Sequence, residues 1–163
     1  MNDRSLKPFR ILFVCLGNIC RSPAAHGIMQ RIVDEDNAAG NFVIDSAGLY
    51  SGHKGELPDP RMRAHAAKRG LDLRHRSRPV EESDFDNFDL IVAMDDSNYS
   101  ALTRMAPTLE DKRKVVRMTD YSRNIVGYDY VPDPYYEGAS GFELVLDLLE
   151  DACAGLYAEL NPS

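Results

Sequence analysis

The chain has 163 residues, a formal net charge of −7 and 44% hydrophobic residues, which predicts one globular domain over residues 1–163 and argues against nucleic acid as a general partner. Its three cysteines, an odd number, argue against a disulfide framework and favour a reducing compartment, so we expect a cytoplasmic protein. No apolar run approaches the length of a membrane span, and residues 1–8 lack the apolar region of a signal peptide.

Strand-like and helical segments alternate along the chain, which predicts an α/β fold with a parallel sheet and helices on both faces. Asp59 and Pro60 mark the start of one helix as N-cap and first helical residue, and Ser140 with Glu143 is predicted to form a capping box at the start of the last helix. In chain order, the predicted elements are a strand at 10–14, a helix at 22–34, a strand at 42–46, a helix at 60–69, a strand at 89–93, a helix at 97–105, a strand at 114–117 and a helix at 140–160.

Two other segments have distinct compositions. Residues 123–138 are rich in turn formers and are predicted to form a long functional loop. The last helix carries an apolar stripe at helical spacing that should face the sheet, and Cys153 beside the stripe is predicted to be a core residue. The stripe consists of Phe142, Val145, Leu149, Ala152, Leu156 and Leu160.

A cysteine stands directly after the first predicted strand, where open parallel sheets bind ligands. Cys15 is followed by five loop residues and then by Arg21 and Ser22 at the start of a helix. Such a strand–loop–helix junction can turn several backbone N–H groups inward and so bind an anion. The same dipoles and the Arg21 guanidinium favour the thiolate of Cys15, which would be a nucleophile aimed at a bound phosphate. The five loop residues are Leu16, Gly17, Asn18, Ile19 and Cys20.

These residues also have simpler interpretations. Cys15 could be a buried structural thiol, and Arg21 a surface cation, although a positive charge at a helix start opposes the helix dipole. Ser22 could be a plain N-cap. Cys20 could join Cys15 in a metal site, but no Cys or His pair elsewhere completes the spacing of metal ligands, so we expect no metal. Gly17 and Asn18 tolerate the positive φ angles of a tight loop.

The motif from Cys15 to Ser22, together with the downstream segment Asp133-Pro134-Tyr135-Tyr136, resembles the low-molecular-weight protein tyrosine phosphatases over roughly residues 10–160. The resemblance implies a doubly wound four-stranded parallel sheet of order 2-1-3-4. It also implies that Cys15 is the nucleophile, that Arg21 and the loop bind phosphate, and that Asp133 is the general acid. Tyr135 and Tyr136 would flank the substrate's phenyl ring, with phosphorylation of either tyrosine left open.

The resemblance implies supporting roles for further residues. Ser22 would stabilise the thiolate, and Cys20 would form a reversible disulfide with Cys15. His75 would hydrogen-bond Asn18, and Ser46 would be another partner behind the loop. Asp95 would be a structural acid that ties back to the loop. Where the family places an aromatic residue that sets substrate preference, either Tyr50 or His53 could stand.

We therefore expect a metal-independent, cofactor-independent phosphatase that acts on phosphotyrosine in proteins, as a monomer or a weak dimer. Three alternatives remain. A protein arginine phosphatase shares the fold, but tends to carry threonine in place of Ile19. An arsenate reductase of the same fold needs extra cysteines on a mobile segment, and helical Cys153 is poorly suited to that role. A non-catalytic phosphate-binding module would need no acid at Asp133. The physiological substrate is not predicted.

Overall fold

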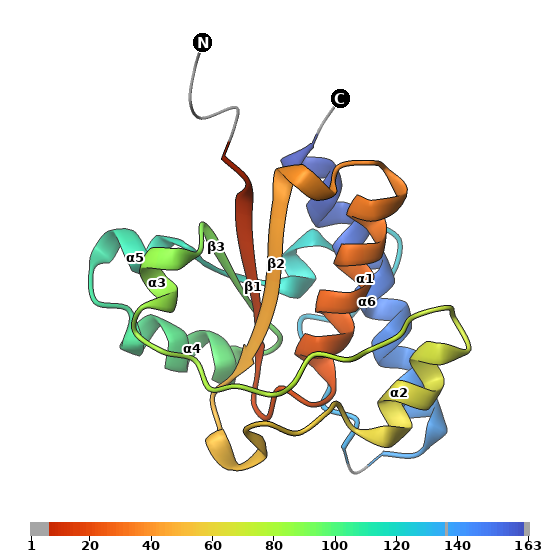
Figure 1. Ribbon diagram of the computed structural model, residues 1–163. Coiled ribbons are helices and arrows are strands. Elements are labelled where there is room, and N and C mark those ends of the chain that lie inside the picture. The colour runs from red at the N-terminus through yellow and green to blue at the C-terminus, as the bar shows by residue number, and fades with distance from the viewer. Residues whose placement is uncertain (1–6, 136, 162–163) are drawn as a thin grey trace.

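The computed structural model describes residues 7–135 and 137–161 of the chain. A four-stranded parallel sheet of order β2-β1-β3-β4 forms its centre, and helices cover both faces of the sheet (Figure 1). The predicted fold class and strand order are confirmed. The strands are β1 (Phe9–Cys15), β2 (Phe42–Gly48), β3 (Leu90–Ala93) and β4 (Val115–Arg117).

Helices follow the strands in alternation, as predicted. The α-helices are α1 (Arg21–Glu35), α2 (Pro60–Ala67), α3 (Asp84–Asn87), α4 (Asp96–Met105), α5 (Leu109–Arg113) and α6 (Ala139–Leu160). The 3₁₀ helices are η2 (Ala39–Asn41), η3 (Ser51–His53) and η4 (Met118–Tyr121). Among the described residues, none of these helices is both long and apolar enough to cross a membrane.

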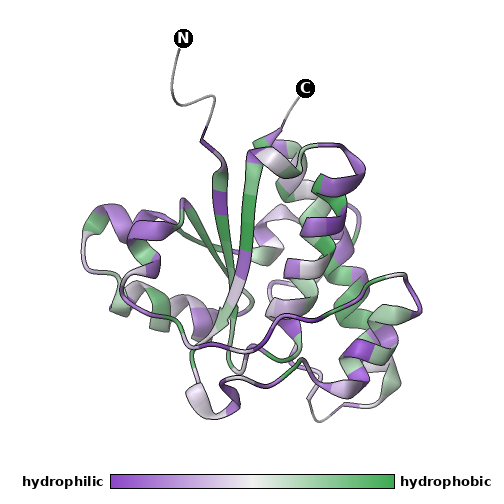
Figure 2. Cartoon of the chain, in the orientation of Figure 1, coloured by the Kyte–Doolittle hydropathy of each residue, from purple (hydrophilic) through white to green (hydrophobic). Residues whose placement is uncertain are grey.

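The central strand β1 is apolar on both of its faces. Residues from Ile11 to Val14 are all inaccessible to solvent. Alternate side chains point to opposite faces of a strand, so Ile11 and Phe13 join a core beneath α1 and α6, whereas Leu12 and Val14 join a second core with Phe85 of α3. A strand between two helical layers must be apolar on both sides, which explains the hydrophobic colour of β1 beyond its first residues, at the centre of Figure 2.

The order of the strands places a ligand site at the carboxyl end of β1. This strand pairs with β2 on one side and with β3 on the other, so the chain leaves β1 and β3 toward opposite faces of the sheet. Such a switch point opens a crevice beyond the carboxyl ends of the strands. Cys15 ends β1, and Asp95 follows β3 and caps the N-terminus of α4 through a bond from Asn98 N. Both residues therefore stand at this crevice.

Two predicted helix starts have different outcomes. Asp59 caps α2 through a hydrogen bond from Arg61 N, with Pro60 at the first position, as predicted. The capping box at Ser140 and Glu143 is wrong, because α6 begins at Ala139 and its N-cap, Gly138, makes no side-chain cap. The Glu143 carboxylate instead accepts a bond from Arg69 of the segment after α2. Arg69, a partner far away in the sequence, thus binds the side chain that local capping would use.

Candidate active site

A cavity of about 220 Å³ lies at the carboxyl end of β1. Its lining combines the predicted motif with the predicted acid, although they are far apart in sequence. The lining residues are Cys15, Leu16, Gly17, Ile19, Cys20, Arg21, Tyr50, His53, Asp133 and Tyr135. A larger hollow beside α1 contains no cysteine among the described residues that line it, so the smaller cavity is the candidate site.

The loop after β1 is held in place by hydrogen bonds that its carbonyl oxygens accept from neighbouring segments. Four of these oxygens accept hydrogen bonds from neighbouring segments: Leu49 N to Cys15 O (3.1 Å), Tyr50 N to Leu16 O (2.8 Å), Ser77 Oγ to Gly17 O (3.0 Å) and Asp59 N to Ile19 O (2.8 Å). Within the described ranges, the backbone N–H groups of residues 17–20 donate to no protein acceptor. Outward carbonyls leave inward N–H groups, which form an anion-binding concavity.

Asn18 fixes the tight turn of this loop. It has a φ of 55°, a left-handed conformation that asparagine tolerates better than most residues. Its side chain is fully buried; Nδ2 donates to Ser22 Oγ at 2.8 Å, and Oδ1 accepts from Arg78 N at 3.1 Å. Gly17, which also tolerates a positive φ, does not have one. Gly17 instead provides space, because a Cβ there would lie 3.2 Å from Cδ2 of His53.

Cys15 is the last residue of β1 and directly precedes this loop. Its Sγ lies 3.0 Å from Ser22 Oγ and accepts a weaker bond from Ser22 N at 3.4 Å. Ser22 is the second residue of α1, whose N-cap is Cys20, so the interpretation of Ser22 as a plain N-cap is wrong. A hydroxyl held by Asn18 and directed at sulfur favours a thiolate, because hydrogen bonds to the charged form stabilise that form.

Cys20 lines the same cavity but has the opposite electrostatic environment. Burial, and then the charge of Asp59, strongly raise the pKa of its thiol. Cys20 therefore stays protonated at neutral pH, and of the two cysteines in the cavity only Cys15 is placed to act as a thiolate nucleophile. Cys153 is fully buried in α6, as predicted, and its Sγ lies 3.8 Å from Ala25 O.

The guanidinium of Arg21 is buried and held by two acceptors from other segments. Its Nη1 donates to Asp95 Oδ2 at 2.7 Å and to Val131 O at 3.1 Å. Burial, the largest effect, lowers the pKa of Arg21, but the negative charges of Cys15 and Asp95 outweigh it and the pKa is raised. Arg21 is therefore a permanent cation in a fixed orientation, which suits binding of phosphate oxygens.

Asp133 lines the same cavity as Arg21. The loop that carries it is pinned at Val131, whose N–H donates to Met94 O at 2.8 Å and whose carbonyl accepts from Arg21. Oδ1 of Asp133 accepts a hydrogen bond from Tyr135 N at 3.1 Å, and Oδ2 lies 3.7 Å from Nη2 of Arg21. The carboxyl group is 45% exposed, so it can meet both a substrate and water.

Aromatic side chains form the rim of the cavity. Tyr50 is 54% exposed and meets the ring of His53 edge-on at 5.7 Å. Both residues line the cavity, so neither of the two candidates for the substrate-contacting position is excluded. Tyr135 also lines the cavity, with the guanidinium of Arg61 5.3 Å from its ring centre. Tyr136, the other predicted aromatic residue, lies outside the described residues.

Two predicted partners of the loop make different contacts. His75 does not bond Asn18; its Nδ1 lies 3.5 Å from Asp45 Oδ1. The hydroxyl of Ser46 bonds Nδ1 of His26 at 3.2 Å. The position predicted for His75 behind Asn18 is occupied by the backbone of Arg78. Sequence reasoning missed Arg78, because a backbone donor carries no residue-type signal.

Comparisons with known proteins agree with this geometry. The family described as "Low molecular weight phosphotyrosine protein phosphatase" matches residues 10–163. A low molecular weight protein-tyrosine-phosphatase of Streptomyces coelicolor is 45% identical, with 94% of each chain covered. The crystal structure of a protein tyrosine phosphatase of Entamoeba histolytica, with Hepes in its active site, superposes with a TM-score of 0.91 at 45% identity, covering 94% of this chain and 97% of that one.

A structure with a different named activity is also similar. The Drosophila arginine phosphatase superposes with a TM-score of 0.84 at 32% identity, covering 93% of this chain and 97% of that one. Fold similarity therefore does not separate phosphotyrosine from phosphoarginine as the substrate, and the residues of the cavity must be used for that purpose.

Proposed function

Since this chain belongs to the low molecular weight phosphotyrosine protein phosphatase family, we propose that it hydrolyses phosphotyrosine in proteins through a phosphocysteine intermediate on Cys15. The observation that carries the proposal is the meeting of three groups in one cavity. The thiol of Cys15, the guanidinium of Arg21 and the carboxyl of Asp133 all line it. A phosphate-binding module would need the first two groups only, and Asp133 adds the acid that turnover requires.

In the first step, the Cys15 thiolate attacks phosphorus while the inward N–H groups and Arg21 hold the three non-bridging oxygens. The S–P bond forms as the P–O bond to the tyrosine ring breaks, and Asp133 gives its proton to the departing phenolate. Ser22, whose Oγ lies 3.0 Å from Sγ, stabilises the sulfur when it is a thiolate. Since Asp95 and Val131 hold Arg21 from behind, binding requires little reorganisation of the cation.

In the second step, a water molecule takes the place of the released tyrosine. Asp133, now ionised, accepts a proton from that water as its oxygen attacks phosphorus. The S–P bond breaks, inorganic phosphate forms, and sulfur returns to the thiolate. The exposed position of Asp133 supports both of its roles, since the same carboxyl must reach the leaving oxygen and the incoming water. The three free cysteines support the proposed cytoplasmic, reducing location.

The competing substrate is phosphoarginine, as the Drosophila relative's name indicates. The proposal favours tyrosine because Ile19 lines the cavity and has no acceptor for the N–H groups of a guanidinium leaving group. An aromatic ring, in contrast, suits the apolar rim of Leu16, Tyr50 and Tyr135. Arsenate reduction is disfavoured, because Cys153 is fully buried within a helix and no relay of electrons could pass through it.

The test is turnover on peptides of one sequence that differ only in the phosphorylated residue, with a chelator present. We expect the phosphotyrosine peptide to be hydrolysed and the phosphoserine peptide to be almost inert. Cys15 is only 2% exposed, so the short serine side chain cannot bring its phosphate to sulfur past the rim. Faster turnover of the phosphoarginine peptide would replace tyrosine by arginine as the substrate. Loss of all activity with the chelator would contradict a cysteine mechanism.

A further inference from the structure

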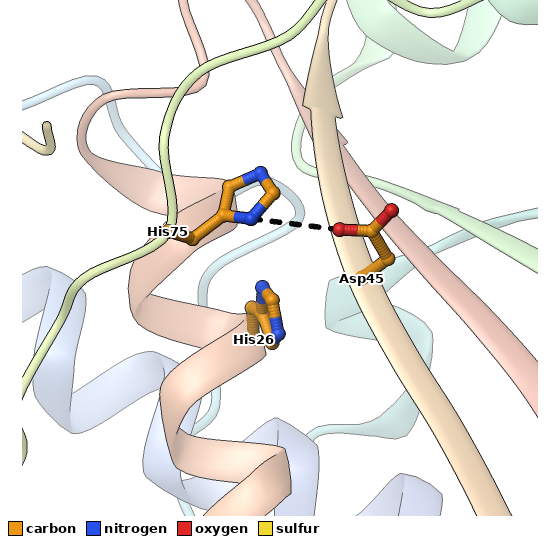
Figure 3. A group of neighbouring side chains, drawn as sticks. All are labelled: His26, Asp45 and His75. Atoms are coloured by element: carbon orange, nitrogen blue, oxygen red, sulfur yellow. Dashed lines mark ion pairs between the residues drawn. The ribbon is translucent and has the colours of Figure 1, made fainter. Parts of the chain in front are cut away.

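Three potential metal ligands lie together outside the active-site cavity. His26 comes from α1, Asp45 from β2, and His75 from the segment that precedes the bridge at Pro79. Figure 3 shows the three side chains gathered between the helix, the strand and that segment. One nitrogen of each imidazole and one carboxylate oxygen all lie within 4.8 Å of one another, and the imidazole ring centres are 5.0 Å apart.

We propose that His26, Asp45 and His75 form a binding site for a divalent transition metal ion, of which zinc is the best suited. Two imidazoles and one carboxylate are a donor set that zinc uses, with a fourth position left to water. Zinc bonds of about 2.0–2.2 Å place tetrahedral ligand atoms roughly 3.4 Å apart. A spread of up to 4.8 Å closes to that value through small rotations of the side chains.

Neighbouring groups form hydrogen bonds with His26 and Asp45, as they usually do with metal ligands. Nδ1 of His26 lies 3.2 Å from Ser46 Oγ, which leaves its Nε2 for a metal ion. Oδ1 of Asp45 accepts from Ser46 N at 2.8 Å, and Oδ2 accepts from Arg78 at 3.0 Å. Such contacts fix the orientation of ligands and raise their affinity for metal. The carboxylate is therefore in place before any ion arrives.

The local charge and the orientation of His75 also favour a cation. Arg78 is shared between Asp45 and buried Asp84, so two carboxylates and one guanidinium leave one net negative charge. Nδ1 of His75 lies 3.5 Å from Asp45 Oδ1, so the imidazole turns one nitrogen toward the carboxylate, where it would bind the ion (Figure 3).

This site is separate from the phosphatase centre. Asp45 lies three residues before Gly48, which pairs with Cys15 in the sheet. At about 3.3 Å per residue along a strand, this separation is roughly 10 Å. An ion held there touches neither the nucleophile nor the phosphate loop. Its effect is to join α1, β2 and the segment of His75, and binding to the folded state alone should raise the temperature of unfolding.

The test is titration of the reduced, metal-free full chain with Zn²⁺ in a calorimeter. We expect one equivalent to bind, and to bind at least ~10-fold more weakly to His26→Gln and His75→Gln, since each lacks one ligand. The matched control is His65→Gln, which removes an imidazole that pairs with Glu143 and has no third ligand among the described residues. It should bind zinc as the wild type does. Cys15→Ser should also bind one equivalent, because the site contains no thiol.

Visible absorption of Co²⁺ bound to the wild type is a second test, and it does not require any variant to fold. One equivalent of Co²⁺ should give the visible bands of a tetrahedral ion without the near-ultraviolet band of a thiolate ligand. The proposal is overturned if the wild type shows neither heat with Zn²⁺ nor cobalt bands. It is also overturned if binding is lost in Cys15→Ser and retained in His75→Gln, which would place the ion on the active-site thiols.

Discussion

Replacement of Cys15 by serine is expected to abolish turnover of aryl phosphates while inorganic phosphate still binds. The serine hydroxyl is a far weaker nucleophile than a thiolate. The loss should be on the order of 10⁶-fold, as for removal of the nucleophile in a serine protease. Phosphate binding should survive, because the inward N–H groups of residues 17–20 and Arg21, held by Asp95 at 2.7 Å, are unchanged.

The matched control is Cys153→Ser. It makes the same chemical change in the core of α6, where the new hydroxyl can bond the carbonyl of Ala25, which already lies 3.8 Å from Sγ. Turnover by this variant should match the wild type at a temperature where both are folded. Steady-state rates and calorimetric titration with phosphate provide the two readouts. Turnover by pure Cys15→Ser well above background would remove Cys15 from its role.

Replacement of Asp133 by alanine should slow phenyl phosphate hydrolysis by roughly 10²–10⁴-fold, the usual contribution of a positioned general acid. A phenol has a pKa of about 10, so its anion leaves poorly unless a proton arrives as the P–O bond breaks. Nitrophenyl phosphates have better leaving groups and should lose less. The rate of phosphoenzyme formation should therefore be nearly independent of leaving-group acidity in the wild type and strongly dependent on it in Asp133→Ala.

Single-turnover measurements on a series of substituted phenyl phosphates would measure the two slopes. Asp133→Asn is the isosteric version, since it can keep the bond from Tyr135 N seen at 3.1 Å but cannot transfer a proton. Asp129→Ala removes an exposed carboxylate from the same loop and should behave as the wild type. Equal slopes for the wild type and Asp133→Ala would exclude Asp133 as the acid, and Asp95 and Asp129 would be the next carboxylates to test.

Local patterns predicted most of the fold. The apolar runs at residues 11–14 and 91–93, within the predicted strands, are buried, as expected for strands between two helical layers. Short helices were missed because they hold too few residues to show a period; Thr108 caps α5, which runs only from Leu109 to Arg113. The order of the strands came from resemblance, since periodicity within a strand says nothing about its neighbours.

Those parts of the site whose chemistry requires a particular type of side chain could be predicted from the sequence. Cys15, Arg21 and Asp133 have side chains that a phosphatase needs, and all three line one cavity. The loop asparagine was predicted by its tolerance of positive φ, and Asn18 has a φ of 55°. The backbone bonds that turn the loop carbonyls outward could not be predicted, since Leu49, Tyr50 and Asp59 donate through main-chain N–H groups common to every residue except proline.

Long-range partners were the least predictable. His75 was placed beside Asn18 by resemblance, but it faces Asp45, which Arg78 also holds. The group of His26, Asp45 and His75 was missed because its members come from a helix, a strand and a loop. Ligands within a short motif have a recognisable spacing, whereas ligands joined only by the packing of separate elements have none.

The central claim, a phosphocysteine on Cys15, is tested most directly by trapping it in Asp133→Ala with nitrophenyl phosphate. The good leaving group lets the S–P bond form without an acid, while the missing base slows hydrolysis, so the intermediate should accumulate. We expect a burst of about one nitrophenolate per active site and, after rapid denaturation, one phosphoryl group that peptide mass spectrometry places on Cys15. Recovery of a protein with no covalently bound phosphoryl group, or with the phosphoryl group on any other residue, would contradict the mechanism.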